Sequence, residues 1–268
     1  MVAIPKKVQE RFVSFIPKYQ KILQNARDRD INESDTVLIV ADILAEVFGF
    51  DKFTEITSEQ AIRGTFCDLA VKQGGSIKYL IEVKAIGLDL KENHLRQAVN
   101  YGSTEGIPWV VLTNGMDWEV YRVTLDQKVN YDRVCGFRFG EIAPRKQEDH
   151  EKLYLLCKEG IEKDAIEEYY SHVESINRFM IGAIVATDPV IDLLRRELRR
   201  VSPGTKVSRE EVEKILLSEV LKRDVVEGES AEAAKRRVKK GAGNLLRKRH
   251  GEEMADAGDA GDDDSPVI

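Results

Sequence analysis

The chain has 268 residues, of which 42% are hydrophobic and 33% are charged. A chain of this length and composition can bury one large hydrophobic core and a second, smaller one. The formal net charge is −6, and residues 1–145 hold 19 Lys and Arg against 20 Asp and Glu, a net charge of −1. This balance excludes a general attraction to polyanions, so nucleic-acid binding would need a local basic patch, a bound metal or a basic segment elsewhere.

The cysteines indicate a reducing compartment. Cys67, Cys135 and Cys157 lack metal-ligand spacing, and their number is odd. Because no N-terminal signal segment is recognisable either, we expect reduced thiols, buried as small hydrophobic residues, in a cytoplasmic protein. No apolar run approaches the length of a membrane span, so we expect no membrane association.

Two helices are predicted at the N-terminus. The first covers residues 6–27 with a helical apolar stripe, and Pro17 should kink or split it. The second is capped by Asn32 or Ser34 and ends at Gly49. A first strand is predicted over residues 52–57.

A β-hairpin is predicted over residues 64–85, where apolar and polar residues alternate on both sides of a Gly-Gly-Ser turn. Cys67, Leu69 and Val71 would share the buried side with Tyr79, Ile81 and Val83, because the apolar positions are odd-numbered in both strands. A three-residue loop of Gly74, Gly75 and Ser76 gives this register. It places Asp68 directly opposite Glu82 on the other side.

Two opposed carboxylates repel each other, so this hairpin favours a cation between Asp68 and Glu82. Oxygen ligands on rigid strands suit Mg²⁺ or Mn²⁺, which bind through one or two carboxylates, waters and substrate phosphate oxygens. Lys84, two residues further along the same side, could orient or help to deprotonate a water and offset negative charge in a transition state. The alternative is a solvent-exposed side on which Asp, Glu and Lys alternate.

A third helix is predicted over residues 90–102, capped by Asp89. On it Leu90, His94, Gln97 and Tyr101 would form one stripe. Gln97 could bind a metal-bound water, a phosphate or Lys84, and the Tyr101 hydroxyl could reach a phosphate oxygen. The alternatives are that Tyr101 is a core aromatic residue and that His94 is a surface residue.

Further strands are predicted over residues 108–113 and 118–123, joined by a turn at 114–117. Residues 127–145 are predicted to form an edge strand and an exit loop. The element order gives an α/β fold with a central mixed sheet flanked by helices.

The sequence motifs resemble those of a known superfamily. Asp68 together with Glu82-Val83-Lys84 resembles the PD-(D/E)XK nuclease signature, although Cys67 stands where a proline often precedes the aspartate. About the first half of the chain resembles, more closely, the N-terminal nuclease domain of type I restriction enzyme R (motor) subunits. The motifs that carry this closer resemblance are Glu33-Ser-Asp-Thr, Phe48-Gly49-Phe50, Gln97 with Tyr101, and Leu112-Thr-Asn-Gly before Trp118.

The resemblance implies a restriction-endonuclease-like core of order αβββαββ and a metal-dependent endonuclease that hydrolyses phosphodiester bonds in DNA, in restriction-modification or repair. It implies Mg²⁺ or Mn²⁺ held by Asp68, Glu82 and the Val83 carbonyl. In the family, an acid from the first helix of the nuclease core joins the site. Here this is the predicted helix that begins near Asn32, so Glu33 is the candidate and Asp35 the reserve. Alternatively, both acids only stabilise the N-terminus of this helix through its dipole. The implied site residues are Glu33, Asp68, Glu82, Lys84, Gln97 and Tyr101.

The rest of the chain is predicted to add a small α-helical domain over residues 146–225 to the nuclease-like domain of residues 1–145. A helix opened by Asp188-Pro189 carries four arginines, which could contact phosphates or form a solvated face with acidic neighbours. Ser208 begins the next helix with a capping box. The arginines are Arg195, Arg196, Arg199 and Arg200.

Residues 226–268 are predicted to be a disordered or transiently helical tail, basic and then acidic. Within it, residues 231–250 hold eight Lys or Arg against one Glu, and could bind nucleic acid non-specifically while the acidic end competes for them. The basic residues are Lys235, Arg236, Arg237, Lys239, Lys240, Arg247, Lys248 and Arg249.

No Gly-x-x-x-x-Gly-Lys-Ser/Thr loop for nucleotide phosphates occurs in the sequence. We therefore expect a standalone relative, to which a protein partner could supply a motor or specificity. The alternative function is a catalytically silent or partner-activated module that uses the nuclease fold to bind nucleic acid or protein.

Overall fold

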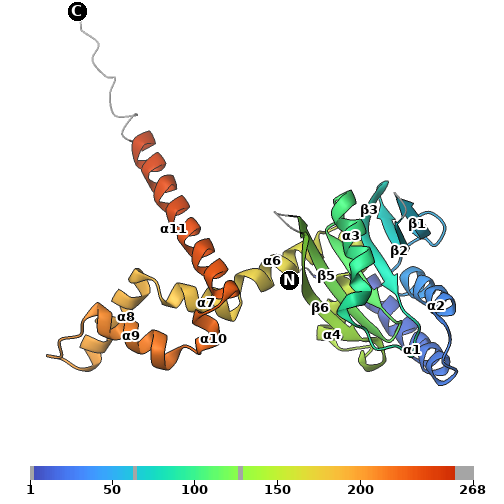
Figure 1. Ribbon diagram of the computed structural model, residues 1–268, viewed down its shortest axis with the longest axis horizontal. Coiled ribbons are helices and arrows are strands. Elements are labelled where there is room, and N and C mark those ends of the chain that lie inside the picture. The colour runs from blue at the N-terminus through green and yellow to red at the C-terminus, as the bar shows by residue number, and fades with distance from the viewer. Residues whose placement is uncertain (1–2, 63–64, 126–128, 257–268) are drawn as a thin grey trace, which may run out of the picture. The chain divides into compact units, whose positions relative to one another are not determined.

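The structure is a computed structural model that describes residues 3–62, 65–125 and 129–256 (Figure 1). The chain divides into two compact units, Met1–Ser171 and His172–Ile268. The acidic end of the tail from residue 257 onward, and with it the predicted competition for the basic segment, lies outside the described residues.

The first unit is built on a six-stranded mixed sheet, as predicted. Its strands follow one another in chain order across the sheet, and only the β3–β4 pair is parallel (Figure 1). A parallel pair needs a crossover connection, and the segment containing helix α3 provides it. The strands are β1 (Ile56–Ile62), β2 (Thr65–Gln73), β3 (Ser76–Val83), β4 (Trp109–Thr113), β5 (Asp117–Leu125) and β6 (Val129–Arg138).

Helices cover both faces of this sheet. One face packs against α1 (Lys6–Asp28) and α2 (Glu33–Glu46) in a core that contains Leu69, Tyr79 and Ile81. The other face packs against α3 (Arg96–Glu105) in a core that contains Leu80, Val110 and Leu112. The β3 residues alternate between the two cores because successive side chains of a strand point to opposite sides.

The β2–β3 hairpin has the predicted pairing of Leu69 with Ile81, but its turn differs from the predicted three-residue loop. Only Gly74 and Gly75 form the turn, with φ of +59° and +79°, and Gln73 pairs with Ser76. A two-residue turn alone would shift the register by one residue and reverse the faces of one strand. A β-bulge between the turn and Leu69 restores it.

Three predicted details of the N-terminal half are wrong. Helix α1 continues through Pro17, so the split that was one of the two predicted outcomes does not occur; Pro17 itself is exposed. The first strand begins at Ile56 rather than at residue 52, because Asp51 accepts backbone hydrogen bonds from Phe53 and Thr54 and so forms a turn. Cys67 packs in the α3 core instead of sharing a side with Leu69.

Asn32 caps α2 as predicted, since its side-chain oxygen accepts a hydrogen bond from the backbone N–H of Asp35 at 2.9 Å. The helix expected over residues 90–102 begins later. A 3₁₀ turn, η1 (Glu92–Leu95), precedes α3, and the N–H of Lys91 donates to the His94 ring at 3.2 Å. Asp89 therefore does not cap the helix.

Residues beyond 145 complete the core of the first unit. Three short helices, α4 (Gln147–Tyr154), α5 (Lys158–Ile161) and the start of α6 (Ala165–Ser175), follow the 3₁₀ turn η2 (Phe139–Glu141). The Tyr79 hydroxyl donates to the Leu156 carbonyl at 2.9 Å, which ties the sheet to this segment. The predicted domain boundary at residue 145 thus falls inside the compact unit, which extends to Ser171.

The second unit is helical, as predicted, and has few buried apolar residues. Ser208 forms the expected capping box with Glu211. The basic part of the predicted tail forms part of helix α11. The unit contains the following helices and turns. They are α7 (Arg178–Val185), α8 (Asp188–Val201), α9 (Arg209–Ile215), the π-helical turn η3 (Leu216–Val220), α10 (Arg223–Val226) and α11 (Glu229–Asp256).

Among the described residues, no helix has both the length and the apolar character needed to cross a membrane.

Candidate active site

The structure brings four of the predicted site residues together where β3 ends. The Lys84 ammonium donates to Glu82 Oε1 at 2.8 Å and lies 3.4 Å from Glu33 Oε2. Glu33 is the first residue of α2, so its carboxylate comes from another element of the fold. Asp68 completes the group from β2.

The backbone holds Lys84 and Asp68 in place. The Lys84 N–H donates to the Thr113 carbonyl at 2.8 Å, which extends the parallel β3–β4 pairing past the end of β3. Asp68 Oδ2 accepts a hydrogen bond of 2.7 Å from the Val83 N–H. The β2–β3 ladder ends at Leu69 and Ile81, so the Asp68 carboxylate satisfies a backbone donor just beyond it.

The carboxylates lie in an environment that disfavours negative charge. Burial raises the pKa of Glu82 to about 7, against the hydrogen bond from Lys84 and with the help of the negative charge of Asp68. Burial also raises the pKa of Asp68, although the Val83 N–H opposes this shift. Among the residues that the structure describes, Lys84 is the cation that pairs with these acids, so the group carries excess negative charge when its three carboxylates are ionised.

The same group keeps Lys84 protonated. Burial lowers the pKa of Lys84, but its hydrogen bond to Glu82 and the charges of Glu82, Glu33 and Asp68 outweigh burial, so the pKa is raised. Lys84 can therefore donate hydrogen bonds at neutral pH but cannot accept a proton.

The residues fit a hard divalent cation. The two carboxylates and the Val83 carbonyl supply only oxygen donors, which Mg²⁺ and Mn²⁺ prefer. Among the described residues, no group of three or more His, Cys, Asp or Glu side chains could hold a metal. Asp68 and Glu82 would therefore supply only two carboxylate ligands, and waters or substrate oxygens would have to fill the remaining positions around Mg²⁺.

Gln97 and Tyr101 lie four residues apart on α3, as predicted, but they differ in exposure. Gln97 is exposed, whereas Tyr101 is 1% exposed and packs in the core with Cys67 and Leu80. This position agrees with the alternative interpretation of Tyr101 as a core aromatic residue. Its hydroxyl is buried without a hydrogen-bond partner in the part of the chain that the structure describes, and a role in the site stays a prediction.

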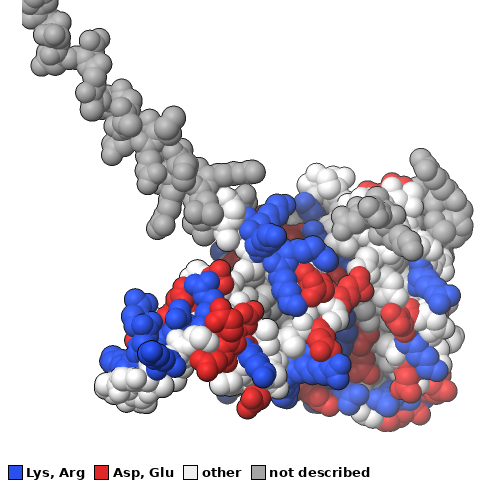
Figure 2. All heavy atoms as spheres, turned by 60° about the vertical axis from the view of Figure 1, so that its left-hand side comes forward, with Lys and Arg blue, Asp and Glu red and all other residues white. Residues whose placement is uncertain are grey.

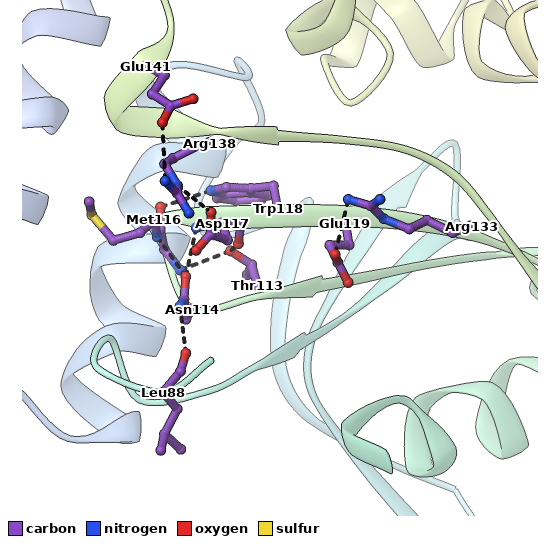
Figure 3. A network of polar contacts seen from close by, with 11 residues as sticks. Leu88, Thr113, Asn114, Met116, Asp117, Trp118, Glu119, Arg133, Arg138 and Glu141 are labelled. Carbon is purple, nitrogen blue, oxygen red and sulfur yellow. Dashed lines mark hydrogen bonds and ion pairs between the residues drawn. The ribbon is translucent and has the colours of Figure 1, made fainter. Parts of the chain in front are cut away.

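A polar network that the sequence did not predict supports the segment after Lys84 (Figure 3). The Asn114 side chain is buried, and its Nδ2 donates to the Leu88 carbonyl at 2.8 Å. Its Oδ1 accepts hydrogen bonds from the N–H groups of Met116 and Asp117. Asn114 thereby joins the loop that follows Lys84 to the β4–β5 turn. The Asn-Gly pair predicted the turn, but the Leu88 contact is not visible in the sequence.

A groove of about 640 Å³ opens beside this network and is lined by residues of β5, β6 and α4. Its lining cations are already paired, as Figure 3 shows for the bonds of Arg138 to Asp117 and Glu141 and of Arg133 to Glu119. Lys146 and Lys152 pair with acids of α4. Each of these four lining cations thus already has an acidic partner, so we assign no phosphate site to the groove.

Comparison with known proteins agrees with the resemblance seen in the sequence. The family model described as type I restriction enzyme R protein N terminus matches residues 43–134. The matched range includes Asp68, Glu82 and Lys84 and ends before α4. No curated protein and no solved structure matches the chain.

Proposed function

From the match of residues 43–134 to the N-terminal family of type I restriction enzyme R proteins, we propose that the chain is a Mg²⁺- or Mn²⁺-dependent nuclease that hydrolyses phosphodiester bonds in DNA. The observation that carries the proposal is the contact of Lys84 with both Glu82 and Glu33, next to Asp68. A chain needs no such concentration of buried charge at a strand end for stability alone.

Each residue has a separate task in this proposal. Asp68 and Glu82 hold the ion together with the Val83 carbonyl, and the bound ion would neutralise phosphate charge and acidify a water. Lys84, kept protonated by its neighbours, donates hydrogen bonds that orient the attacking water and offset charge on the phosphate oxygens. Glu33 holds the Lys84 ammonium from the side of α2.

The exposed position of Gln97 on α3 allows contact with a substrate phosphate. The buried Tyr101 hydroxyl would support the site from inside the α3 core. DNA as substrate, and a protein partner that supplies a motor or specificity, follow from the named family and are part of the proposal.

A plasmid-nicking assay tests the proposal. We expect the full chain to nick supercoiled plasmid in Mn²⁺, and we expect Asp68→Ala and Lys84→Ala to lower the rate at least about 100-fold, as is usual when a group that stabilises transition-state charge is lost. Asp42→Ala is a matched control, because Asp42 is a half-buried α2 acid that is paired with Lys52 away from the candidate site. Equal nicking by all four proteins would mean that the activity comes from a contaminant.

The second candidate is a binding module without catalysis. The hydrogen bonds within the site favour this candidate, because Glu82 accepts from Lys84 and Asp68 accepts from the Val83 N–H. Both carboxylates thus have partners without a metal ion. Calorimetric titration with Mn²⁺ distinguishes the two. A nuclease site should bind the ion only when both carboxylates are present, whereas a binding module should show no such dependence.

A further inference from the structure

The second unit carries a basic surface that is independent of the candidate active site. In Figure 2, Lys and Arg are interspersed with Asp and Glu over much of the face shown, and many cations of the second unit form ion pairs. Arg178, Arg200, Arg209 and Arg223 each contact an acid within 3.3 Å. These paired cations have little charge left to offer a ligand.

Helix α11 differs from this pattern. Its residues Arg236, Lys239 and Lys240, which we call the α11 basic face, are exposed. None of the three has a hydrogen bond or a close ion pair with any residue that the structure describes, although Arg236 lies near the charge of Glu232, the partner of Lys235. By contrast, Lys235 pairs with Glu232 and Arg237 with Glu174 on the same helix.

Helical spacing gathers these three cations on one side. Residues three and four positions apart are neighbours on a helix, so Arg236 lies beside Lys239 and Lys240. The packed side of α11 contains Ala231 and Ala234, which are 1% and 5% exposed, and the helix contacts α7. At 100° per residue, the basic face points away from that packed side.

We propose that the α11 basic face binds the phosphate backbone of nucleic acid. Unpaired cations along an exposed helix gain affinity by displacing counterions from a polyanion. A lipid surface fits less well, because a membrane-bound helix needs large apolar side chains on its other side. On α11 that other side contains the buried Ala231 and Ala234, and the helix contacts α7. The choice of duplex DNA as the polyanion rests on the proposed nuclease function.

The proposal is tested by DNA binding of the full chain in EDTA, where cleavage cannot occur. A labelled DNA duplex is titrated over a range of salt concentrations with wild type and with the triple variant Arg236→Gln, Lys239→Gln, Lys240→Gln. Since each phosphate contact contributes about 0.9 to the slope of log K against log salt concentration, we expect the slope to become shallower by up to about 2.7. At low salt, affinity should fall at least about 10-fold.

The matched control is the triple variant Arg200→Gln, Arg223→Gln, Lys235→Gln, which loses the same charge from cations paired at 2.7 Å. It should keep the wild-type slope. Equal slopes for wild type and the basic-face variant would overturn the proposal. So would binding to phosphatidylserine vesicles in the absence of DNA binding. If the wild-type chain bound DNA through the α11 basic face but did not nick plasmid in Mn²⁺, only the proposed nuclease function would be contradicted.

Discussion

Glu82 is 5% exposed and lies among one cation and two other acids. Because burial raises its pKa to about 7 from the ordinary 4.5, the folded state holds a proton on Glu82 at pH values where the unfolded state has released it. The free energy of unfolding should therefore fall as the pH rises from about 4.5 to about 7 in the absence of a divalent ion.

This pH dependence gives a prediction at the scale of one residue. In EDTA, wild type should lose up to about 3 kcal/mol of unfolding free energy between pH 5 and pH 8 relative to Glu82→Gln, which cannot ionise. Urea unfolding followed by tryptophan fluorescence measures it, since both tryptophans, Trp109 and Trp118, lie in the first unit. The same pH slope in both proteins would show that Glu82 does not titrate in this range.

A divalent ion should reverse the trend. Because the ion and the proton compete for Glu82, Mn²⁺ should stabilise wild type more at pH 8 than at pH 5. Glu82→Gln should show a smaller effect of Mn²⁺ at both pH values. The pH dependence therefore reports on the metal site without any measurement of cleavage.

At the scale of elements, the end of α3 lies very close to the segment that leads into β4, at Gly102. A Cβ atom at this position would lie 2.8 Å from the Ile107 carbonyl oxygen and 3.5 Å from a methyl group of Val110. The Ile107 N–H also donates to the Gly102 carbonyl at 2.8 Å, so this backbone cannot move away easily. Gly102 thus allows the close approach between the end of α3 and the segment that leads into β4.

Gly102→Ala should therefore lower the unfolding free energy by about 1–3 kcal/mol, as overpacking of a core does. Gly140→Ala is the control, because a Cβ atom there would meet only Met116, at an ordinary distance of 3.7 Å. Thermal unfolding of both variants provides the comparison. Equal stability of Gly102→Ala and wild type would mean that α3 can shift at little cost.

At the scale of the whole molecule, the first core depends on residues beyond the predicted boundary. Leu153 and Leu156, which follow residue 145, are fully buried in it. Residues 1–175, which keep α6 intact, should therefore unfold cooperatively as an isolated fragment. A fragment of residues 1–145 should be destabilised or insoluble, since it exposes the apolar surface that α4 and α5 cover.

Circular dichroism and thermal unfolding of the two fragments test this expectation. The full chain serves as the reference for the transition of the first unit. If residues 1–145 unfolded as cooperatively as residues 1–175, the helices after residue 145 would be dispensable for the first core.

The sequence by itself determined the features that depend on neighbouring residues. Alternation of apolar and polar residues predicted the hairpin and the pairing of Leu69 with Ile81, just beyond which Asp68 and Glu82 lie, because strand periodicity is a local property. The capping roles of Asn32 and Ser208 were equally local. The edge strand β6 and the mixed sheet also followed from the order of the predicted elements.

Only the tertiary structure decided which distant segments meet. It brought Glu33 of α2 to Lys84, buried the Tyr101 side chain of α3 in the core and placed Asn114 against Leu88. It also extended the first unit to Ser171. The physical reason is that such contacts depend on how whole helices pack on the sheet, whereas periodicity reveals only which side of an element is apolar.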